Sequence, residues 1–173
     1  MVVFETERLL IRKLNIDDAD FMLDLLNQPS FHHFIGDRGV RTTEDARTYI
    51  RDRAISIYEK AGLGPFAVEL KSNGDVIGVS SLLKRDELDD VDVGFAFLPD
   101  YWKQGFATES GNAALEFAFS ELGLDRIVAV TQSDNVGSIK TLENMGMVFE
   151  KMVRLEDEGP DLQLFSIERS SGS

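Results

Sequence analysis

Residues 91–108 read VDVGFAFLPDYWKQGFAT, an apolar run that a proline turn separates from a glycine and the segment after it. The composition of residues 91–98 is typical of a buried strand. Residues 107–122 predict a helix, because their apolar side chains recur at three- and four-residue spacing and small residues dominate that stripe. A helix with small residues on one side can lie close to the sheet it covers. With the β-branched run 126–131, RIVAVT, the stretch predicts a β–α–β unit.

The rest of the chain predicts strands and helices on both sides of this unit. They are a strand at 7–14, a helix from about 17 to 28, a loop at 30–40 with buried aromatic anchors, a helix from about 42 to 60, strands at 66–70 and 76–83 that form a hairpin, a helix at 136–144, and strands at 147–155 and 162–169. The predicted order, β-α-α-β-β-β-α-β-α-β-β, indicates an α/β fold with a mixed sheet. We expect one domain over residues 1–173, with an ordered core from about 5 to 169.

Composition and charge exclude several classes of function. The formal net charge is −13 at pH 7, so phosphate backbones and anionic membrane surfaces repel the protein, and we expect neither nucleic-acid nor membrane partners. The absence of cysteine excludes disulfides, thiolate nucleophiles and Cys-ligated zinc. The two histidines, His32 and His33, are sequence neighbours that cannot easily converge on one metal ion. With no signal peptide and no long apolar run, we expect a cytoplasmic protein without a metal site.

The turn at residues 103–108 is a candidate anion site. It contains Gly105 and leads directly into the predicted helix, so unpaired N–H groups lie at the positive end of the helix dipole. Phosphate is the natural ligand of such a turn. The Gly-Lys-Ser/Thr and G-x-G-x-x-G fingerprints of nucleotide-binding loops are absent from the sequence. A single glycine here is equally explained by the backbone angle of the turn alone.

Further motifs stand in order around this turn. The strand at 91–98 comes first, Gly105–Glu109 opens the helix, and Asn135-x-x-Ser138 follows the next strand. In order and spacing the pattern resembles the GNAT superfamily of acyl-CoA-dependent N-acetyltransferases, most closely the branch that acetylates the amino termini of ribosomal proteins. The resemblance covers about residues 5–169. It implies acetyl-CoA as cosubstrate and a sheet whose central strands splay apart to admit it.

The resemblance assigns the pyrophosphate of coenzyme A to the turn. The family's loop motif is Arg/Gln-x-x-Gly-x-Gly/Ala, which Gly105 and Ala107 match, while Trp102 stands at its first position. The amides implied to hold the pyrophosphate belong to Lys103, Gln104, Gly105, Phe106, Ala107 and Thr108.

The resemblance also places the pantetheine arm between the splayed strands. Phe95 and Phe97 would pair with the arm through their backbones, and the amide of Phe97 or of Leu98 would face the thioester oxygen. Asn135 would bond the pantetheine or the acyl carbonyl. It could equally cap the following helix, and the two roles are compatible.

Candidate catalytic residues follow from the same comparison. Many members carry a tyrosine as general acid where this chain has Leu142, which cannot donate a proton. The ribosomal branch instead places a serine three residues after the asparagine, so Ser138 is the implied acid, although a serine in a first helical turn is otherwise ordinary. Lys140 either reaches a phosphate or lies on a solvated helix face. Asp92 and Glu69 are either general bases acting through water or strand residues that face solvent or form ion pairs.

The implied reaction is the attack of a primary amine on the acetyl thioester. At pH 7 about one-seventh of an α-amino group is unprotonated, against about one in 2,500 for lysine, so the N-terminal amine of a protein or peptide is the expected acceptor. Alternatives are a cationic small amine, such as a polyamine, amino acid or drug, and a noncatalytic acyl-CoA-binding module. His33 and Phe34 resemble in position the family's substrate-facing segment. Either a monomer or a homodimer is compatible with the sequence.

Overall fold

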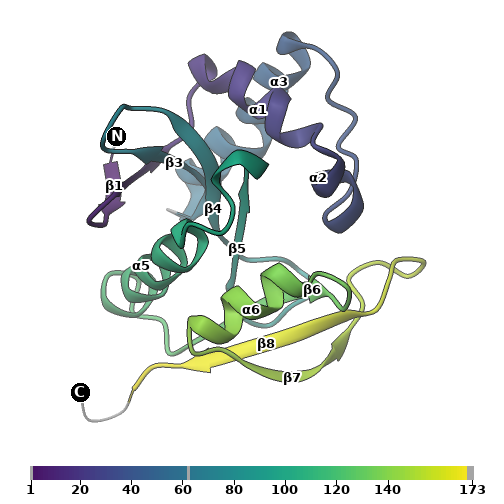
Figure 1. The fold of residues 1–173 in the computed structure, drawn as a ribbon. Helices are drawn as coiled ribbons and strands as arrows, with labels where there is room; N and C mark the ends of the chain where they lie inside the picture. The colour runs from purple at the N-terminus through teal and green to yellow at the C-terminus, as the bar shows by residue number, and fades with distance from the viewer. Residues whose placement is uncertain (1, 62, 171–173) are drawn as a thin grey trace.

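One mixed sheet forms the centre of the computed structural model, which describes residues 2–61 and 63–170 (Figure 1). Residues 1, 62 and 171–173 of the predicted domain lie outside the described residues. The strands, in sheet order, are β1 (Val2–Glu5), β2 (Leu9–Lys13), β3 (Gly64–Leu70), β4 (Val76–Leu83), β5 (Asp92–Phe97), β6 (Arg126–Gln132), β8 (Leu162–Glu168) and β7 (Val148–Val153). Neighbouring strands are antiparallel except β5 and β6, which are parallel.

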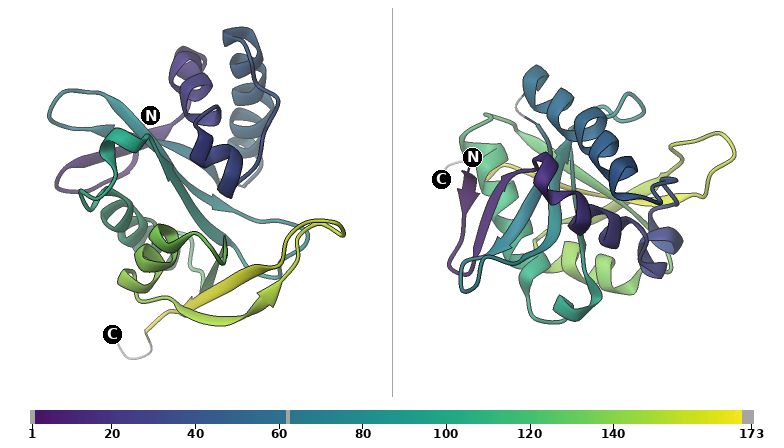
Figure 2. Two further views of the ribbon diagram at one scale, coloured as in Figure 1. Left: turned by 45° about the vertical axis from the view of Figure 1, so that its right-hand side comes forward. Right: turned by 90° about the horizontal axis from the view of Figure 1, so that it is seen from above.

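Helices cover both faces of this sheet. They are η1 (Ile16–Asp18), α1 (Ala19–Leu26), α2 (Pro29–Phe34), α3 (Thr43–Ile50), η2 (Arg51–Ile55), α4 (Ser56–Ala61), η3 (Pro99–Tyr101), α5 (Phe106–Ser120) and α6 (Val136–Asn144). Figures 1 and 2 show α1, α2 and α3 grouped on one side of the central strands, with α5 and α6 on the other. Strands β5 and β6 therefore lie between two helical layers.

The predicted mixed α/β fold is confirmed, including the helix with small residues on one side. Ala114 and Ala118 of α5 are fully buried. At Gly111 an added Cβ would lie 2.5 Å from the sulfur of Met145, which follows α6. The absence of a side chain at Gly111 thus admits α6 beside α5, and the small residues serve helix packing as well as contact with the sheet.

Strand β1 was not predicted, since the first strand was expected at residues 7–14. It pairs antiparallel with β2 across a tight turn in which Thr6 N–H donates to the carbonyl of Leu9 at 2.8 Å. Its Phe4 ring stacks on Phe117 of α5, with the ring centroids 5.2 Å apart. A four-residue strand has little periodicity of its own, and these tertiary contacts stabilise it.

The prediction of a loop with buried aromatic anchors at residues 30–40 is wrong for the first residues of that segment. Helix α2 occupies Pro29–Phe34 and has no buried residue. The physical reason is Pro29, which stands in the first turn of α2. The fixed φ of proline suits that position, and its missing N–H leaves no bond unmade there.

The helix predicted from about 42 to 60 is interrupted by a π-helical segment, η2. Its start is as expected, because Thr42 caps α3 through a hydrogen bond from the amide of Asp45 at 3.0 Å. The wider π turn keeps Ile50, Ala54 and Tyr58, which are spaced by four residues, on one buried face.

Strands β5 and β6 pair at only one position, Asp92 opposite Val128. There the amide of Val128 donates to the carbonyl of Val91 at 3.0 Å. Beyond that point β5 continues to Phe97 and β6 to Gln132 without a further rung of the parallel ladder. The central strands therefore splay apart, as the sequence resemblance implied.

Candidate active site

Successive backbone amides of β5 point alternately toward β4 and toward the gap where β5 and β6 separate, which we call the splay. The N–H of Leu98 donates to the carbonyl of Ile77 on β4 at 3.0 Å. Because successive peptide groups of a strand point to opposite sides, the N–H and C=O groups of Phe97 and Phe95 point away from β4, toward the splay. Both residues thus have the orientation expected for pairing with pantetheine. The alternative that the Leu98 amide faces the thioester is wrong, because β4 already binds it.

Trp102 connects the strand to the turn that follows. Its indole N–H donates to the carbonyl of Phe97 at 2.8 Å, while 46% of its surface is exposed. An aromatic residue at the first position of the loop motif therefore has a definite role: it binds one of the β5 carbonyls that faces the splay. The sequence shows that Trp102 departs from the family motif, but it does not predict the hydrogen bond from Trp102 to Phe97.

The turn before α5 has the conformation of an anion-binding backbone. Lys103 has a φ of +61° and Gly105 a φ of +83°, so two left-handed residues flank Gln104. Gly105 is the N-cap of α5 and has no side chain to satisfy the first helical amides. Those amides, in residues 106–108, point outward from the helix end, where its dipole is positive. Alternating left-handed residues form concave nests of N–H groups that bind anions.

A second set of predicted residues lies at the start of α6. The side-chain oxygen of Asn135 accepts a hydrogen bond from the amide of Ser138 at 3.2 Å, so Asn135 does cap the helix. The cap leaves its Nδ2 amide available for another partner. Ser138 is half-buried in the first turn, whereas Lys140 is exposed. Leu142 is 1% exposed and belongs to the apolar core between α5 and the sheet.

The segment with His33 and Phe34 lies beside this second set. The His33 Nε2 atom is 2.9 Å from Asp134 Oδ2, adjacent in sequence to Asn135. The side-chain amide of Gln132, at the end of β6, donates to the carbonyl of Phe34 at 3.1 Å. These contacts bring α2 to the open end of the splay, so the predicted substrate-facing residues and the Asn135 motif meet in space.

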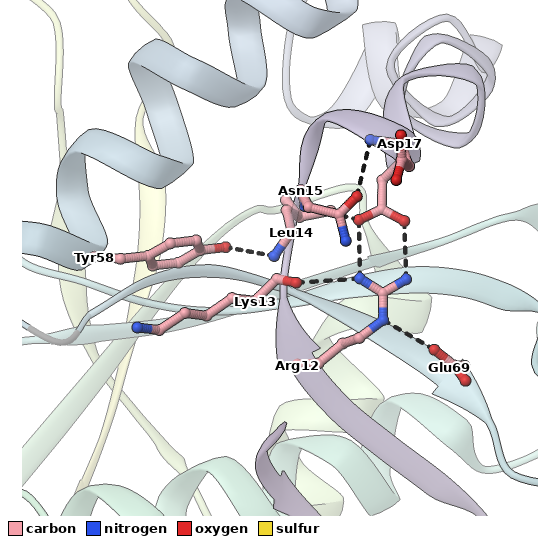
Figure 3. A network of polar contacts seen from close by, with 8 residues as sticks. Arg12, Lys13, Leu14, Asn15, Asp17, Tyr58 and Glu69 are labelled. Carbon is pink, nitrogen blue, oxygen red and sulfur yellow. Dashed lines mark hydrogen bonds and ion pairs between the residues drawn. The ribbon is translucent and has the colours of Figure 1, made fainter. Parts of the chain in front are cut away.

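The two candidate bases each bind an arginine. Glu69 accepts a hydrogen bond from Arg12 Nε at 2.9 Å within the network drawn in Figure 3. Asp92 accepts from Arg85 Nε at 2.8 Å, at the closed end of the splay, and is 2% exposed. Burial raises the pKa of Asp92, against the opposing effect of Arg85. The alternative of ion-paired strand residues thus describes the contacts of both carboxylates.

The raised pKa of Asp92 predicts the pH dependence of an Asp92→Asn variant. A carboxyl group whose folded pKa exceeds its unfolded value stabilises the fold below the unfolded pKa and loses that contribution as the pH rises through the folded pKa. The asparagine does not ionise. We therefore expect the free energy of unfolding of the variant, relative to wild type, to increase between about pH 4 and pH 7.

Urea denaturation of both proteins at several pH values measures this difference. The control is Asp161→Asn, at a carboxylate that is 60% exposed and pairs with Arg154, where the change should stay below about 1 kcal/mol throughout. If the free energy of unfolding of Asp92→Asn relative to wild type decreased with rising pH, the ion pair with Arg85 would outweigh burial in its effect on the pKa of Asp92.

No metal site or membrane span accompanies these features in the described part of the chain. Within residues 2–61 and 63–170, no three His, Cys, Asp or Glu side chains gather closely enough to hold a metal ion. None of the helices described there is long and apolar enough to cross a bilayer.

Comparison of the sequence with known proteins identifies relatives over most of its length. YnaD of Bacillus subtilis, an uncharacterized N-acetyltransferase, is 29% identical over 166 residues, covering 94% of either chain. YoaA of the same organism, also an uncharacterized N-acetyltransferase, is 28% identical over 155 residues, or 88% of this chain and 86% of YoaA.

Solved structures share the fold, and a family model matches the sequence. A GNAT-family acetyltransferase from Bacillus anthracis is 27% identical with a TM-score of 0.80, covering 97% of this chain and 98% of that one. The ribosomal L7/L12 alpha-N-protein acetyltransferase RimL, solved in complex with coenzyme A, has a TM-score of 0.83 at 14% identity, with coverage of 97% and 98%. The family model described as an acetyltransferase (GNAT) domain matches residues 8–148. Since that match extends over well more than half of the sequence, the chain belongs to the GNAT acetyltransferase family.

Proposed function

We propose that this acyl-CoA-dependent N-acetyltransferase transfers an acetyl group from acetyl-CoA to the α-amino group of a protein or peptide. The observation that carries the proposal is that both candidate bases are already bound by arginines, Glu69 by Arg12 and Asp92 by Arg85. Neither carboxylate is placed to take a proton from a substrate ammonium group, because Glu69 is held by Arg12 and Asp92 is only 2% exposed at the closed end of the splay. The reaction therefore favours an amine that is partly unprotonated at neutral pH, which an α-amino group is and a lysine is not.

The residues of the splay and the turn fit acetyl-CoA. The nest at residues 103–108 suits the diphosphate, and the backbone groups of Phe95 suit the amides of pantetheine, whereas the Phe97 carbonyl is already bound by Trp102. When bound there, acetyl-CoA supplies the thioester. In the proposed arrangement the Phe97 N–H donates to the carbonyl oxygen as negative charge develops on it, and one such donor contributes about 2.7 to 4 kcal/mol.

Two side chains at the start of α6 are proposed to complete the site. The Nδ2 group of Asn135, which the helix cap leaves available, would donate to pantetheine or to the acyl carbonyl. Ser138 would give its hydroxyl proton to the departing thiolate as general acid. Lys140 is exposed on the same helix and would add positive charge near the phosphates.

The acceptor is proposed to approach past α2. Phe34 and His33 lie beside the residues that precede Asn135, as their contacts with Gln132 and Asp134 show. The net charge of −13 attracts a cationic peptide toward the protein and so raises its local concentration.

An acceptor panel tests the proposed function. Thiol release from acetyl-CoA is measured with basic peptides that have a free amino terminus, the same peptides with a blocked terminus and an internal lysine, and polyamines and amino acids. We expect release with the free termini, and mass spectrometry should place the acetyl group there. Faster release with a polyamine or with the blocked peptides would contradict the α-amine assignment. Coenzyme binding without release on the whole panel would contradict catalysis.

Ser138→Ala is expected to lower turnover about 100-fold, the lower end of the usual contribution of a general acid, while the Kd for acetyl-CoA stays nearly constant. The matched control is Ser133→Ala, an exposed serine before the same helix, whose turnover should equal that of wild type. Steady-state kinetics and calorimetric titration separate the two effects. Unchanged turnover of Ser138→Ala would remove this residue from the proposed mechanism.

A further inference from the structure

Arg8, just before β2, joins the N-terminal strands to the turn that opens α5. Its Nη1 donates to the carbonyl of Gln104 at 3.0 Å, and its Nε donates to Glu109 Oε1 at 2.7 Å. The guanidinium carbon lies 4.3 Å from the centroid of the Phe106 ring. A Cβ added at Gly105 would lie 3.3 Å from Arg8 Nη2. One side chain from another part of the fold therefore contacts Gln104 and Phe106 in the turn and Glu109 just after it, and lies close to Gly105.

The bond to Gln104 fixes a peptide group at the centre of the turn. In a trans peptide the carbonyl and the following N–H point in opposite directions. By binding the Gln104 carbonyl, Arg8 directs the N–H of Gly105 to the side of the turn away from the guanidinium. Lys103 and Gly105, on either side of Gln104, have left-handed backbones, which for a lysine is an unfavourable conformation. The contact thus supports the part of the nest that is least stable by itself.

Arg8 also neutralises a carboxylate next to the proposed diphosphate site. Glu109 lies in the first turn of α5. Burial opposes its ionisation, but hydrogen bonds from Thr6 and Arg8 outweigh burial and lower the pKa of Glu109. The Arg8 backbone N–H donates to Glu109 Oε2 at 3.1 Å, in addition to the side-chain ion pair. Without Arg8, a negative charge with no positive partner here would repel the phosphates.

We infer that Arg8 is a positioning residue for the coenzyme diphosphate, acting through the Gln104 carbonyl and the Glu109 carboxylate. The inference rests on the proposed function, since it assumes that the diphosphate binds at residues 103–108. It assigns Arg8 an effect on the nucleotide end of the donor and none on the thioester end. It also supplies, from the residue before β2, a guanidinium at a loop whose own first position is Trp102.

The test compares two acetyl donors in an Arg8→Gln variant. Acetyl-CoA carries the diphosphate, whereas S-acetyl-pantetheine has the same thioester without it. With acetyl-CoA we expect KM to rise roughly 10- to 100-fold, the factor for losing a hydrogen bond to a charged group, with kcat within about twofold of wild type. With S-acetyl-pantetheine kcat/KM should stay within about twofold. The double variant Arg8→Gln/Glu109→Gln should regain part of the affinity for acetyl-CoA, because the unpaired charge is gone.

The matched control is Arg126→Gln, which likewise removes an ion-paired arginine, here one bound to Asp90 and Glu150, but touches none of the loop residues. Its kinetics with both donors should equal those of wild type. If Arg8→Gln does not fold, Arg8→Lys is the second variant. It keeps the positive charge but loses the forked donors of the guanidinium, so its KM should rise several-fold for acetyl-CoA but not for S-acetyl-pantetheine. An unchanged KM for acetyl-CoA, or equal losses with both donors, would overturn the inference. A wild-type protein that fails to bind acetyl-CoA would contradict the proposed function instead.

Discussion

Gly105→Val is expected to abolish acetyl-CoA binding without unfolding the chain. Gly105 has a φ of +83°, where a β-branched residue is strained by about 1–3 kcal/mol. The turn can relieve this strain only by changing its backbone, which rotates the amides of residues 103–108 out of the nest. Hydrogen bonds to charged groups contribute about 1.5–3 kcal/mol each, so losing two of them lowers the affinity about 100-fold or more. Calorimetric titration with acetyl-CoA measures the loss.

Gly123→Val is the matched control for this prediction. Gly123 also has a positive φ, +67°, and an added Cβ there meets nothing within 4 Å. It follows α5, at the opposite end of the helix from the nest, so the variant has similar backbone strain and should bind acetyl-CoA like wild type. Full affinity in Gly105→Val would refute the placement of the diphosphate at this turn. Equal losses in both variants would trace the effect to general destabilisation.

Local patterns in the sequence predict much of this fold. Residues 136–144 form helix α6 as predicted, and the strands at 66–70 and 76–83 pair as the expected hairpin. The signals there lie within a few residues of each other. The insertion of β8 between β6 and β7 has no such signal, because it depends on pairing between strands distant along the chain. Strand β1 lacks a signal for another reason: it pairs with the adjacent β2, but its four residues have little periodicity and its Phe4 stacks on Phe117, far along the chain.

The candidate site likewise has some features that the sequence predicts and others that it does not. The turn at Gly105 and the Asn135 cap follow from motifs with fixed spacing, and the structure gives both the expected local geometry. Arg8 was not predicted, because 96 residues separate it from Gln104 and 101 from Glu109. Side chains that support a site from another strand have no local pattern. For the same reason the sequence could not decide whether Glu69 was a free base or paired with Arg12.

Arg12→Met is expected to lower the free energy of unfolding by about 3–5 kcal/mol, because it leaves a buried carboxylate unpaired. Arg12 binds both oxygens of Asp18, at 2.8 and 2.9 Å. It also binds Glu69, as Figure 3 shows. Asp18 is only 7% exposed, and it also accepts from the amide of Asn15 at 2.9 Å, where it closes the capping box of η1. The guanidinium thus joins β2 and β3 to the start of α1. Methionine retains the apolar stem but none of these bonds.

Urea denaturation measures the loss, and two further variants establish its cause. Arg154→Met breaks an ion pair with Asp161 in which both side chains are more than half exposed, and it should lower the free energy by less than about 1 kcal/mol. Adding Asp18→Asn to Arg12→Met removes the unpaired charge, so the double variant should be more stable than Arg12→Met alone. If the effects of Arg12→Met and Asp18→Asn on the free energy of unfolding were additive instead, the Arg12–Asp18 ion pair would contribute no coupling energy. The loss in Arg12→Met would then come from packing of the arginine stem.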